Sequence, residues 1–398
     1  MIRMHRCILA SRFVGVACMI GLAATSGRCE ELSTSVATAL ERAGDNRPEL
    51  ERALREVPVS HRAGMEFLVA YMPLRDLTSL PAEFLLENVE YAYRAYDESP
   101  WKDGVPQDVF LNDVLPYANI TERRDNWRKS FYEKFKPLVA GIKTSGEAAV
   151  VLNQQLFPLL EVKYSTKRRR ADQGPEETIE SGIATCSGLS ILLIDACRAV
   201  GVPARFVGIP MWPDGSGNHS WVEVWDQGWH FTGAAEPAGD ELDRAWFNER
   251  ASGALRDEIE HAIFAVSYRK TPQVLPLRWG DDSNVIYTVN VTDRYAGKAP
   301  ELSDGQVRVM FRVLDGAENT ERVAAEIEVH DAQGTLLFSG TTKDDRFDLN
   351  DHLVAVLPRD AELHVHVCHD KAVLDARVTP RDEGQLVSLE LADGASAQ

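Results

Sequence analysis

The segment that decides the fold spans residues 181–203 and reads SGIATCSGLSILLIDACRAVGVP. Its apolar residues recur at the spacing that is typical of one face of a helix. Gly201 and Pro203 follow directly and are stop signals for a helix. The segment therefore predicts a buried helix with Cys186 in its first turn and with apolar positions at Leu189, Leu192, Leu193, Ala196, Cys197 and Val200.

The position of Cys186 indicates a nucleophile. The first turn of a helix carries unsatisfied backbone N–H groups and the positive end of the helix dipole, and both stabilise a thiolate. Gly182 and Gly188 lie close by and would leave room for a substrate backbone. The alternative is that Cys186 is a small buried hydrophobe, which is the description that Cys197 fits on the body of the same helix.

A second informative stretch, NHSWVEVWDQGW, covers residues 218–229. Short strands are predicted at 204–209, 220–225 and 229–232, and the alternation of a strand places His219, Trp221 and Glu223 on one face. A cysteine at a helix N-terminus followed by a histidine on a neighbouring strand is the arrangement that a thiolate–imidazolium nucleophile requires.

Taken in order, these motifs resemble the transglutaminase-like superfamily. They are Gly-x-x-x-Cys ending at Cys186, Gly-Val-Pro-Ala-Arg from Gly201, His-x-Trp-x-Glu-Val from His219, and Gly-Trp at 228–229. The resemblance covers about residues 176–240. It implies a papain-like Cys-His-Asp core, as in transglutaminases, bacterial cysteine peptidases and peptide N-glycanases. It also implies that Cys186 is the nucleophile and that His219 is the general base and acid.

The third catalytic position departs from the family, which has Asp where this sequence has Gly233. The nearest acid is Glu236. If Trp229 pairs with Trp225 or with the next residue along the hairpin, His219 lies opposite residue 235 or 236, so Glu236 can reach the imidazole. Glu223 lies four strand residues from His219, about 13 Å, which is too far for contact.

An oxyanion hole needs hydrogen-bond donors near the thiolate. The backbone N–H of Cys186 is one such donor. Gln173 is a second candidate, by analogy with the glutamine that precedes the cysteine in papain-like enzymes, and Trp221 is a candidate substrate contact. No metal or organic cofactor is needed for this chemistry, and no calcium-binding loop is recognisable.

Composition and the N-terminus indicate an exported protein. The 398-residue chain has a net charge of -18, which argues against nucleic acid as a partner. Residues 1–26 combine three arginines with a short apolar run, which is the pattern of a signal peptide. Cys29, Cys186, Cys197 and Cys368 remain after cleavage; Cys186 and Cys197 are separated by roughly 16 Å along a helix, too far for a disulfide.

The patterning predicts an α+β fold: a papain-like transglutaminase core preceded by a helical domain and followed by a β-sandwich. We expect a signal peptide at 1–26, a helical domain at 30–165, the core at 166–270 and an Ig-like sandwich at 280–392. Within these, a further helical stretch is predicted near 241–266 and a strand at 285–291. The basic run 167–170 could bind an anionic group, although a solvated loop is the favoured interpretation.

A second possible site lies in the last predicted domain, where His364, His366 and Cys368 share one strand face. These residue types bind copper or zinc, but the three are too spread along one strand to hold a single ion without a bulge. A solvent-facing polar side is therefore preferred and no metal site is predicted.

The sequence predicts an exported cysteine hydrolase or acyltransferase that acts on amide bonds of a protein, peptide or glycopeptide, in the periplasm or outside the cell, with no membrane span after signal cleavage. The alternative is a catalytically silent module that binds peptide or glycan at the cell surface. The absence of the usual Asp favours the silent alternative, and the oligomeric state is not predicted.

Overall fold

The computed structural model describes residues 33–276, 285–316 and 321–391. From Thr34 onward the chain forms one compact unit. The predicted signal peptide and Cys29 lie outside the described residues, so these two predictions stay as they are. None of the described helices is long and apolar enough to cross a membrane.

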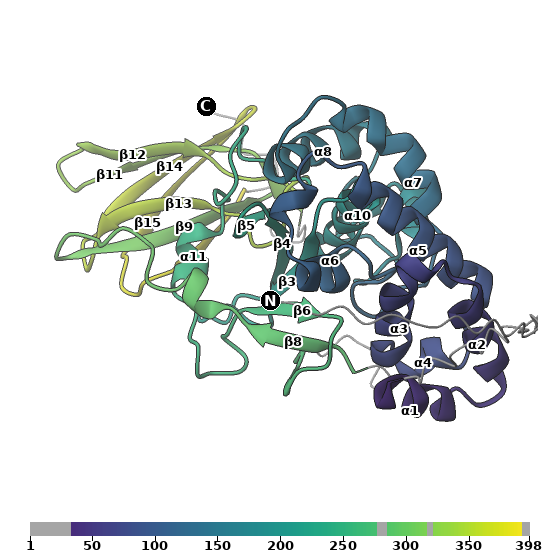
Figure 1. Cartoon of the computed structure of the whole chain (residues 1–398). Helices are drawn as coiled ribbons and strands as arrows, with labels where there is room; N and C mark the ends of the chain where they lie inside the picture. Colours follow the sequence, from purple (N-terminus) through teal and green to yellow (C-terminus); the bar gives the residue numbers. More distant parts are fainter. Residues whose placement is uncertain (1–32, 277–284, 317–320, 392–398) are drawn as a thin grey trace, which may run out of the picture. The chain divides into compact units, whose positions relative to one another are not determined.

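Helices dominate the chain from residue 34 to residue 160 (Figure 1). The helices are α1 Thr34–Arg42, α2 Arg47–Glu56, α3 Arg62–Tyr71, α4 Leu74–Leu77, α5 Ala82–Asp97, α6 Gln107–Asp113, α7 Arg128–Phe135 and α8 Ser145–Leu160. Short 3-10 turns separate some of them: Gly44–Asn46, Val59–His61, Lys102–Gly104 and Lys136–Val139. This part of the chain supplies the scaffold against which the next helix packs.

Helix α10, Cys186–Ala199, is the predicted central helix, and every residue of it except Cys186 is buried. It follows α9, Pro175–Ser181, and a parallel pair of two-residue strands, β1 Lys163–Tyr164 and β2 Ile183–Ala184. One side of α10 packs on α5, α7 and α8, and the other side packs on β3 and β4. A helix enclosed in this way is largely apolar, and its buried charged residues Asp195 and Arg198 have hydrogen-bond partners in the Asn119 side chain and in the Ala204 carbonyl.

The sheet beside α10 has six strands in the order β5-β4-β3-β6-β8-β7 (Figure 1). All neighbours in it are antiparallel. The strands predicted at 204–209, 220–225 and 229–232 are confirmed as β3, β4 and β5. The bounds are β3 Ala204–Ile209, β4 His219–Trp225, β5 Trp229–Thr232, β6 Phe264–Ser267, β7 Gln273–Val274 and β8 Tyr287–Asn290.

The helical stretch predicted near 241–266 is wrong. This segment contains only the short helix α11, Asn248–Ser252, and then strand β6. Phe247 and Ile263 lie in irregular backbone and Ala251 lies in α11, and all three pack into a cluster around Trp212 and Trp221. Apolar spacing here reflects the shape of that cluster and not a helix repeat.

The strand predicted at 285–291 is present as β8, but it pairs with β6 in the six-stranded sheet. The domain boundary at 280 would have assigned it to the C-terminal sandwich. Alternation of apolar residues predicts a strand but does not specify which sheet the strand joins. The 3-10 turn Thr292–Arg294 follows this strand.

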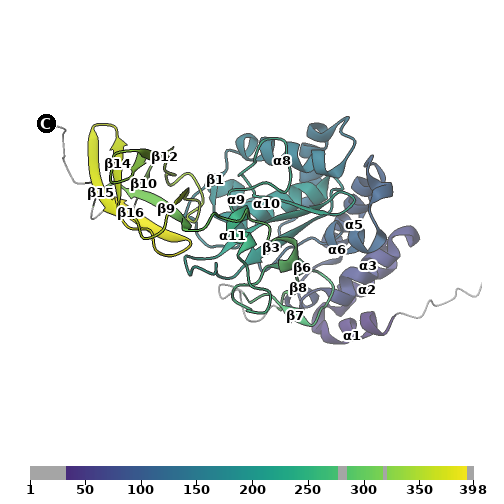
Figure 2. The same ribbon diagram turned by 90° about the vertical axis from the view of Figure 1, so that its left-hand side faces the viewer.

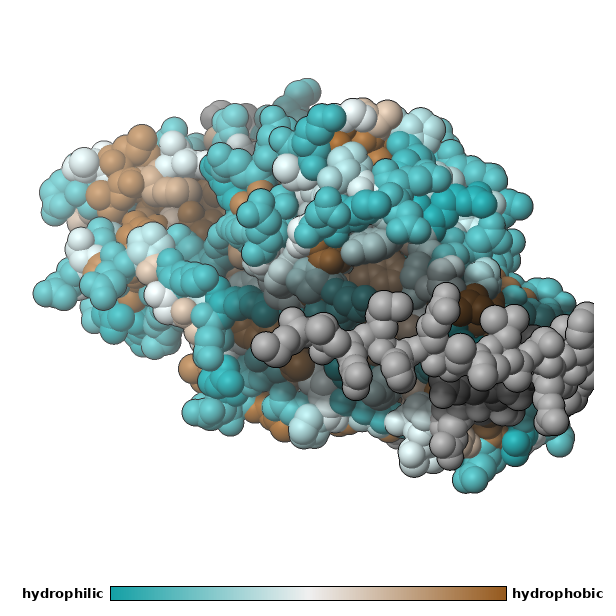
Figure 3. Space-filling view, in the orientation of Figure 1, coloured by the Kyte–Doolittle hydropathy of each residue, from teal (hydrophilic) through white to brown (hydrophobic). Residues whose placement is uncertain are grey.

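The C-terminal part consists of two four-stranded sheets that share one hydrophobic core (Figures 1 and 2). In the first sheet β16 Gln385–Glu390 pairs along one edge of β9 Gln306–Leu314, and β13 Leu353–Pro358 and β10 Arg322–Val323 pair along its other edge. The second sheet has the order β12 Leu336–Thr341, β11 Glu326–His330, β14 Leu363–His369 and β15 Ala372–Val378. Figure 3 shows hydrophobic side chains on the surface of the C-terminal sheets. The exposed apolar residues of β12 and β15 are Leu336, Leu337 and Val373.

The connection between β12 and β13 (residues 342–352) matters most for the site, because it reaches from the C-terminal sheets to the six-stranded sheet. Asn350 Nδ2 donates to the Asn218 carbonyl at 2.9 Å, and Arg250 Nη1 donates to the Asn350 carbonyl at 2.9 Å. The N–H of Leu349 donates to the Tyr164 hydroxyl at 2.8 Å. These hydrogen bonds place the connection directly beside His219.

Candidate active site

Cys186 is the first residue of α10 and is half-buried. The N-cap residue Thr185 makes no side-chain bond to the helix, and its hydroxyl instead accepts a hydrogen bond from Arg168 Nε at 2.8 Å. The N–H groups of the first turn are therefore not capped by that side chain, which is the condition for an anion at a helix N-terminus. Arg168, from the predicted solvated loop, thus lies next to the nucleophile position.

The two glycines near Cys186 serve the local backbone. Gly182 ends α9 at a φ of 68°, where a left-handed residue is needed. A Cβ on Gly188 would lie 2.9 Å from the Ala184 Cβ, so this glycine lets α10 approach β2 closely. Both glycines thus have structural roles, and the expectation that they leave room for a substrate backbone stays a prediction.

His219 is the first residue of β4 and only 1% exposed. The strand and α10 are joined directly beside the two reactive residues, because the Ser187 and Ser220 hydroxyls form a hydrogen bond of 2.9 Å. The rings of Trp246 and Phe247 lie 4.9 and 5.0 Å from the imidazole. The predicted pairing of a helix-start cysteine with a histidine on a neighbouring strand is present in this geometry.

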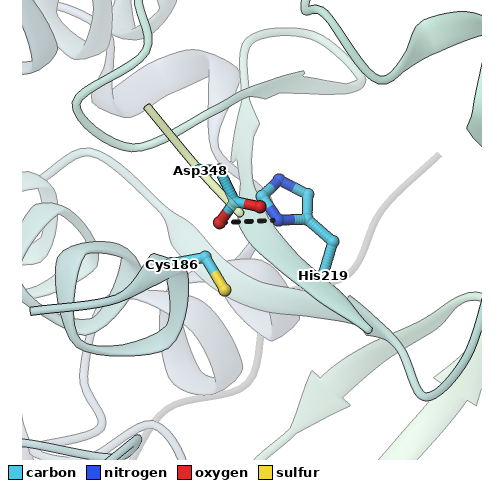
Figure 4. A group of neighbouring side chains, drawn as sticks. All are labelled: Cys186, His219 and Asp348. Atoms are coloured by element: carbon cyan, nitrogen blue, oxygen red, sulfur yellow. Dashed lines mark ion pairs between the residues drawn. The ribbon is translucent and has the colours of Figure 1, made fainter. Parts of the chain in front are cut away.

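Two carboxylates face the imidazole from opposite sides. Asp348 Oδ2 lies 3.6 Å from His219 Nδ1, and Glu236 Oε2 lies 3.9 Å from Nε2. Figure 4 shows the Cys186 sulfur and the Asp348 carboxylate on the same side of the ring. Neither ring nitrogen has a hydrogen-bond partner within the described residues.

Glu236 lies where the hairpin arithmetic predicted it. Trp225 pairs with Trp229, as the arithmetic assumed, and the paired residues end at Thr232. A Cβ on Gly233 would lie 2.5 Å from Glu236 Oε2, so the Glu236 carboxylate fills the space that a side chain at 233 would enter. Trp246 Nε1 donates to the same oxygen at 2.9 Å and fixes it.

Asp348 is the residue that the sequence reasoning missed. It lies in the β12–β13 connection, and its Oδ1 accepts hydrogen bonds from Asn350 N at 2.9 Å and Asn350 Nδ2 at 3.3 Å. No motif marks it, because it is one of several acids in the run DDRFDLND at 344–351. Only the long-range contact with β4 distinguishes it from its neighbours.

The charges of the site are strongly coupled. Burial acts to lower the pKa of His219, but Asp348 and Cys186 outweigh it and hold this pKa well above its usual value. Burial likewise opposes ionisation of Asp348, yet His219 and the Asn350 hydrogen bonds hold the pKa of Asp348 below its usual value. Burial raises the pKa of Glu236 to about 8, with His219 opposing the shift and Asp348 adding to it. At neutral pH Asp348 is therefore the ionised partner of His219.

Gln173 is buried, and both N–H groups of its amide are used nearby. They are donated to Ser181 Oγ at 3.2 Å and to the Ile183 carbonyl at 3.0 Å. In this conformation Gln173 fixes the turn before Cys186 and does not offer a free donor to an oxyanion. Its predicted role as a second oxyanion donor finds no support in this arrangement.

Trp221 is fully buried and donates its Nε1–H to the Tyr295 hydroxyl at 2.9 Å. It stacks parallel to Trp212 and packs on Phe247, so it is a core residue and not a substrate contact. Glu223, two residues further on β4, is buried in the same layer and pairs with Arg205 at 2.6 Å. The strand face that begins with His219 thus continues as protein core.

A cavity of about 800 Å³ borders the site. Its walls come from α8, the turn after β5 and the β12–β13 connection, and they include Tyr164, Glu236, Trp246 and Asp348. The cavity gives a molecule from solvent access to both carboxylates that face His219.

One thiol, one imidazole and one carboxylate meet in the site. A ligand-type atom of Cys186, of His219 and of Asp348 all lie within 4.8 Å of one another, the one such group of three in the part of the chain that the structure describes. The strand face at 364–368 does not gather in this way. There His366 bonds Asp375 at 2.8 Å through Nδ1 and Cys368 at 3.3 Å through Nε2.

Comparison with solved structures finds partial likenesses. A provisionally assigned cysteine protease from Cytophaga hutchinsonii aligns at 18% identity with a TM-score of 0.24, over 28% of this chain and 38% of that one. The Bacillus anthracis TIE protein aligns at 11% identity with a TM-score of 0.18, over 48% of this chain and 30% of that one. The chain thus spans well under half the length of either protein. A comparison with curated protein sequences finds no match.

A comparison with family models gives one match, to the transglutaminase-like superfamily over residues 134–233. The matched region begins within α7, contains the whole of α10 and β4, and ends at Gly233. It therefore includes Cys186 and His219 but neither of the two carboxylates that face the imidazole. The predicted resemblance is confirmed: residues 134–233 match the transglutaminase-like superfamily.

Proposed function

We propose that this protein is an exported cysteine hydrolase or acyltransferase that acts on amide bonds of a protein, peptide or glycopeptide through a thioester. The observation that carries the proposal is the position of Cys186 at the start of α10 beside His219 at the start of β4, with a carboxylate near each imidazole nitrogen. A thiol, a base and an orienting acid in this order are the requirements for covalent catalysis.

The roles follow from the geometry. The Cys186 thiolate attacks the amide carbon, and the His219 imidazolium gives its proton to the departing amine. Water or a second amine then attacks the thioester, returns a proton to His219 and restores the thiolate. The N–H of Cys186, at the uncapped start of α10, is a donor for the oxyanion.

Glu236 takes the place of the family's aspartate in this proposal. Its carboxylate occupies the space beside Gly233 and faces the Nε2 atom, while Trp246 holds it. Glu236 Oε2 lies 3.9 Å from Nε2, so a shift of about 1 Å would let it accept a hydrogen bond that fixes the tautomer and the orientation of the ring. Asp348 balances the charge on His219 from the other side.

The proposed setting is outside the cytoplasm, either periplasmic or extracellular, after removal of residues 1–26. We further propose that the two C-terminal sheets, which contain β9 to β16, form an Ig-like β-sandwich domain that accompanies the transglutaminase-like core and the helical domain. No nucleic-acid partner is proposed, because the net charge of -18 would repel a polyanion.

A second candidate is a catalytically silent module that binds peptide or glycan. The observation that favours it is the β12–β13 connection, which lies against a His219 that is only 1% exposed. In a silent module this contact would be permanent, and Cys186 would have no enhanced reactivity.

Alkylation by iodoacetamide, followed peptide by peptide in a mass spectrometer, separates the two candidates. Cys197 is an internal control, because burial raises the pKa of its thiol to about 12. An active site predicts fast labelling of Cys186 near pH ~6, and a loss of at least roughly tenfold in both His219→Ala and His219→Gln. Labelling of Cys186 that rises only near the ordinary thiol pKa of about 8.5, and that both variants leave unchanged, would refute the enzyme.

A further inference from the structure

We infer that Cys186, His219 and Asp348 form a binding site for one Zn²⁺ ion, and that this ion reversibly blocks the nucleophile. The inference concerns the regulation of the site, and its blocking role rests on the proposed function. The binding itself rests only on the three side chains and their surroundings.

The donor set is of the kind that zinc prefers. Zinc in proteins is held by cysteine sulfur, histidine nitrogen and carboxylate oxygen, mostly in tetrahedral geometry. One atom of each kind is present here, and the three lie within 4.8 Å of one another. They come from the start of α10, the start of β4 and the β12–β13 connection, so the fold itself brings them together.

The spacing between the imidazole and the carboxylate suits two ligands of one ion. His219 Nδ1 and Asp348 Oδ2 lie 3.6 Å apart, beyond the range of about 2.7–3.2 Å for a hydrogen bond. Two ligand atoms at about 2.1 Å from a tetrahedral zinc ion are separated by about 3.4 Å. The observed distance therefore requires only a small adjustment to admit an ion.

The imidazole has two ion-pair neighbours, Asp348 and Glu236, but no hydrogen bond of ordinary length. Both nitrogens of His219 are without a hydrogen-bond partner in the described residues, although the side chain is 1% exposed. Such groups are rare in folded proteins; a catalytic role accounts for some of them, and a bound ion or water accounts for others. Figure 4 shows the Cys186 sulfur and the Asp348 carboxylate on the side of the ring that carries Nδ1.

The surroundings resemble the second layer of a zinc site. A histidine that binds zinc usually turns its other nitrogen toward a carboxylate, and a carboxylate ligand is itself hydrogen-bonded. Nε2 of His219 faces Glu236, which Trp246 holds at 2.9 Å, and Oδ1 of Asp348 accepts two hydrogen bonds from Asn350. The 800 Å³ cavity along Asp348 provides an entry path and room for a water as fourth ligand.

Occupation by zinc would prevent the proposed reaction. In the thiolate–imidazolium pair the displaced proton is the one on Nδ1 of His219, so binding releases this proton to solvent and uses a lone pair of the Cys186 sulfur for the metal. It also uses the Nδ1 lone pair of His219, so neither group can attack a carbonyl or transfer a proton. No bond within the protein is made or broken, and a chelator restores the free site.

The first experiment titrates the full mature chain with ZnCl₂ alone, and calorimetry gives the number of ions bound. A second titration uses CoCl₂, whose sulfur-to-cobalt charge-transfer band shows that a cysteine sulfur binds the metal. We expect one ion per chain. Affinity should fall more than about 100-fold in Cys186→Ser and in the isosteric Asp348→Asn. The matched control Cys368→Ser, on β14 with another half-buried thiol, should bind within about threefold of wild type.

The inference is overturned if no ion binds, or if binding survives in both Cys186→Ser and Asp348→Asn. It is also overturned if Cys368→Ser abolishes binding, since the ion would then belong to the strand face at 364–368. Alkylation separates this inference from the proposed function. Zinc should suppress alkylation of Cys186 and leave alkylation of Cys368 unchanged. Slow alkylation of Cys186 in the metal-free chain would refute the proposed enzyme but would not contradict zinc binding.

Discussion

Replacement of Arg322 by lysine should loosen the β12–β13 connection and with it the position of Asp348. Arg322 is buried, with 2% of its side chain exposed. Its guanidinium donates to four carbonyls of the connection: those of Asp344 at 2.9 Å, Phe347 at 2.7 Å, Leu349 at 3.4 Å and Asp351 at 3.1 Å. This one side chain thus determines the course of the connection.

The size of the effect follows from those bonds. A lysine ammonium is a point donor and cannot reproduce the planar fork that reaches four carbonyls. A hydrogen bond to a charged group contributes about 1.5–3 kcal/mol, and a buried carbonyl left unsatisfied costs about 1–3 kcal/mol. Loss of one or two bonds therefore lowers the local opening free energy by about 2 kcal/mol, which is about a 30-fold change in the opening equilibrium.

Hydrogen exchange measured by mass spectrometry tests this directly. Amides of the connection that are hydrogen-bonded, such as Leu349 to Tyr164 and Asp351 to Asp348, should exchange about 30-fold faster in Arg322→Lys. The control is Arg377→Lys on β15, because Arg377 is 67% exposed and its ion-pair partner Glu362 is exposed as well. Equal exchange of these amides in the two variants would refute the assignment of Arg322 as the anchor of the connection.

Three further predictions concern stability. Gly201 has a φ of 85°, and a Cβ added there would lie 2.5 Å from the Ala95 carbonyl oxygen. Gly201→Ala should therefore lower the free energy of unfolding in urea by more than about 2 kcal/mol. The control Gly253→Ala, at a φ of -82°, should lower it by less than about 0.5 kcal/mol. Equal losses in the two glycine variants would contradict the steric argument. Burial raises the pKa of Asp113 to about 6, so this residue binds its proton more tightly in the folded state and its contribution to stability falls as pH rises from about 4 to about 6. The stability of Asp113→Asn relative to wild type should therefore increase by up to about 3 kcal/mol between pH ~4 and ~7, and a constant difference would exclude the shift. Glu223→Gln should lower the free energy of unfolding by about 3–5 kcal/mol in thermal unfolding, because Arg205 would remain buried without this charged partner. A loss below about 1 kcal/mol would show that the Arg205–Glu223 pair is not buried in solution.

The sequence was sufficient for the parts of the site that are local. Cys186 could be placed at a helix start because the apolar spacing and the stop signals define α10 without reference to the rest of the chain. His219 followed from strand alternation, and Glu236 from the pairing of Trp225 with Trp229. Each of these inferences depends on residues fewer than about 20 positions away from one another along the chain.

The parts that failed depend on distant contacts. Asp348 approaches His219 only because the C-terminal sheets place the β12–β13 connection against β4, and no local pattern encodes that docking. The predicted helix at 241–266 failed for the same reason, since Phe247 and Ile263 are apolar in order to pack on Trp212. Gln173 and Trp221 are predicted from motifs alone, and in the structure both side chains are used in internal hydrogen bonds.

The place of Asp348 in the chain also sets the order in which the site is completed during synthesis. The ribosome makes Cys186 and His219 more than a hundred residues before the β12–β13 connection. A nascent chain can therefore fold its six-stranded sheet while the thiol and imidazole have no aspartate between them and solvent. The last strands to emerge would close the site, so a chain cut between β8 and β9 would keep the reactive pair and lose its cover.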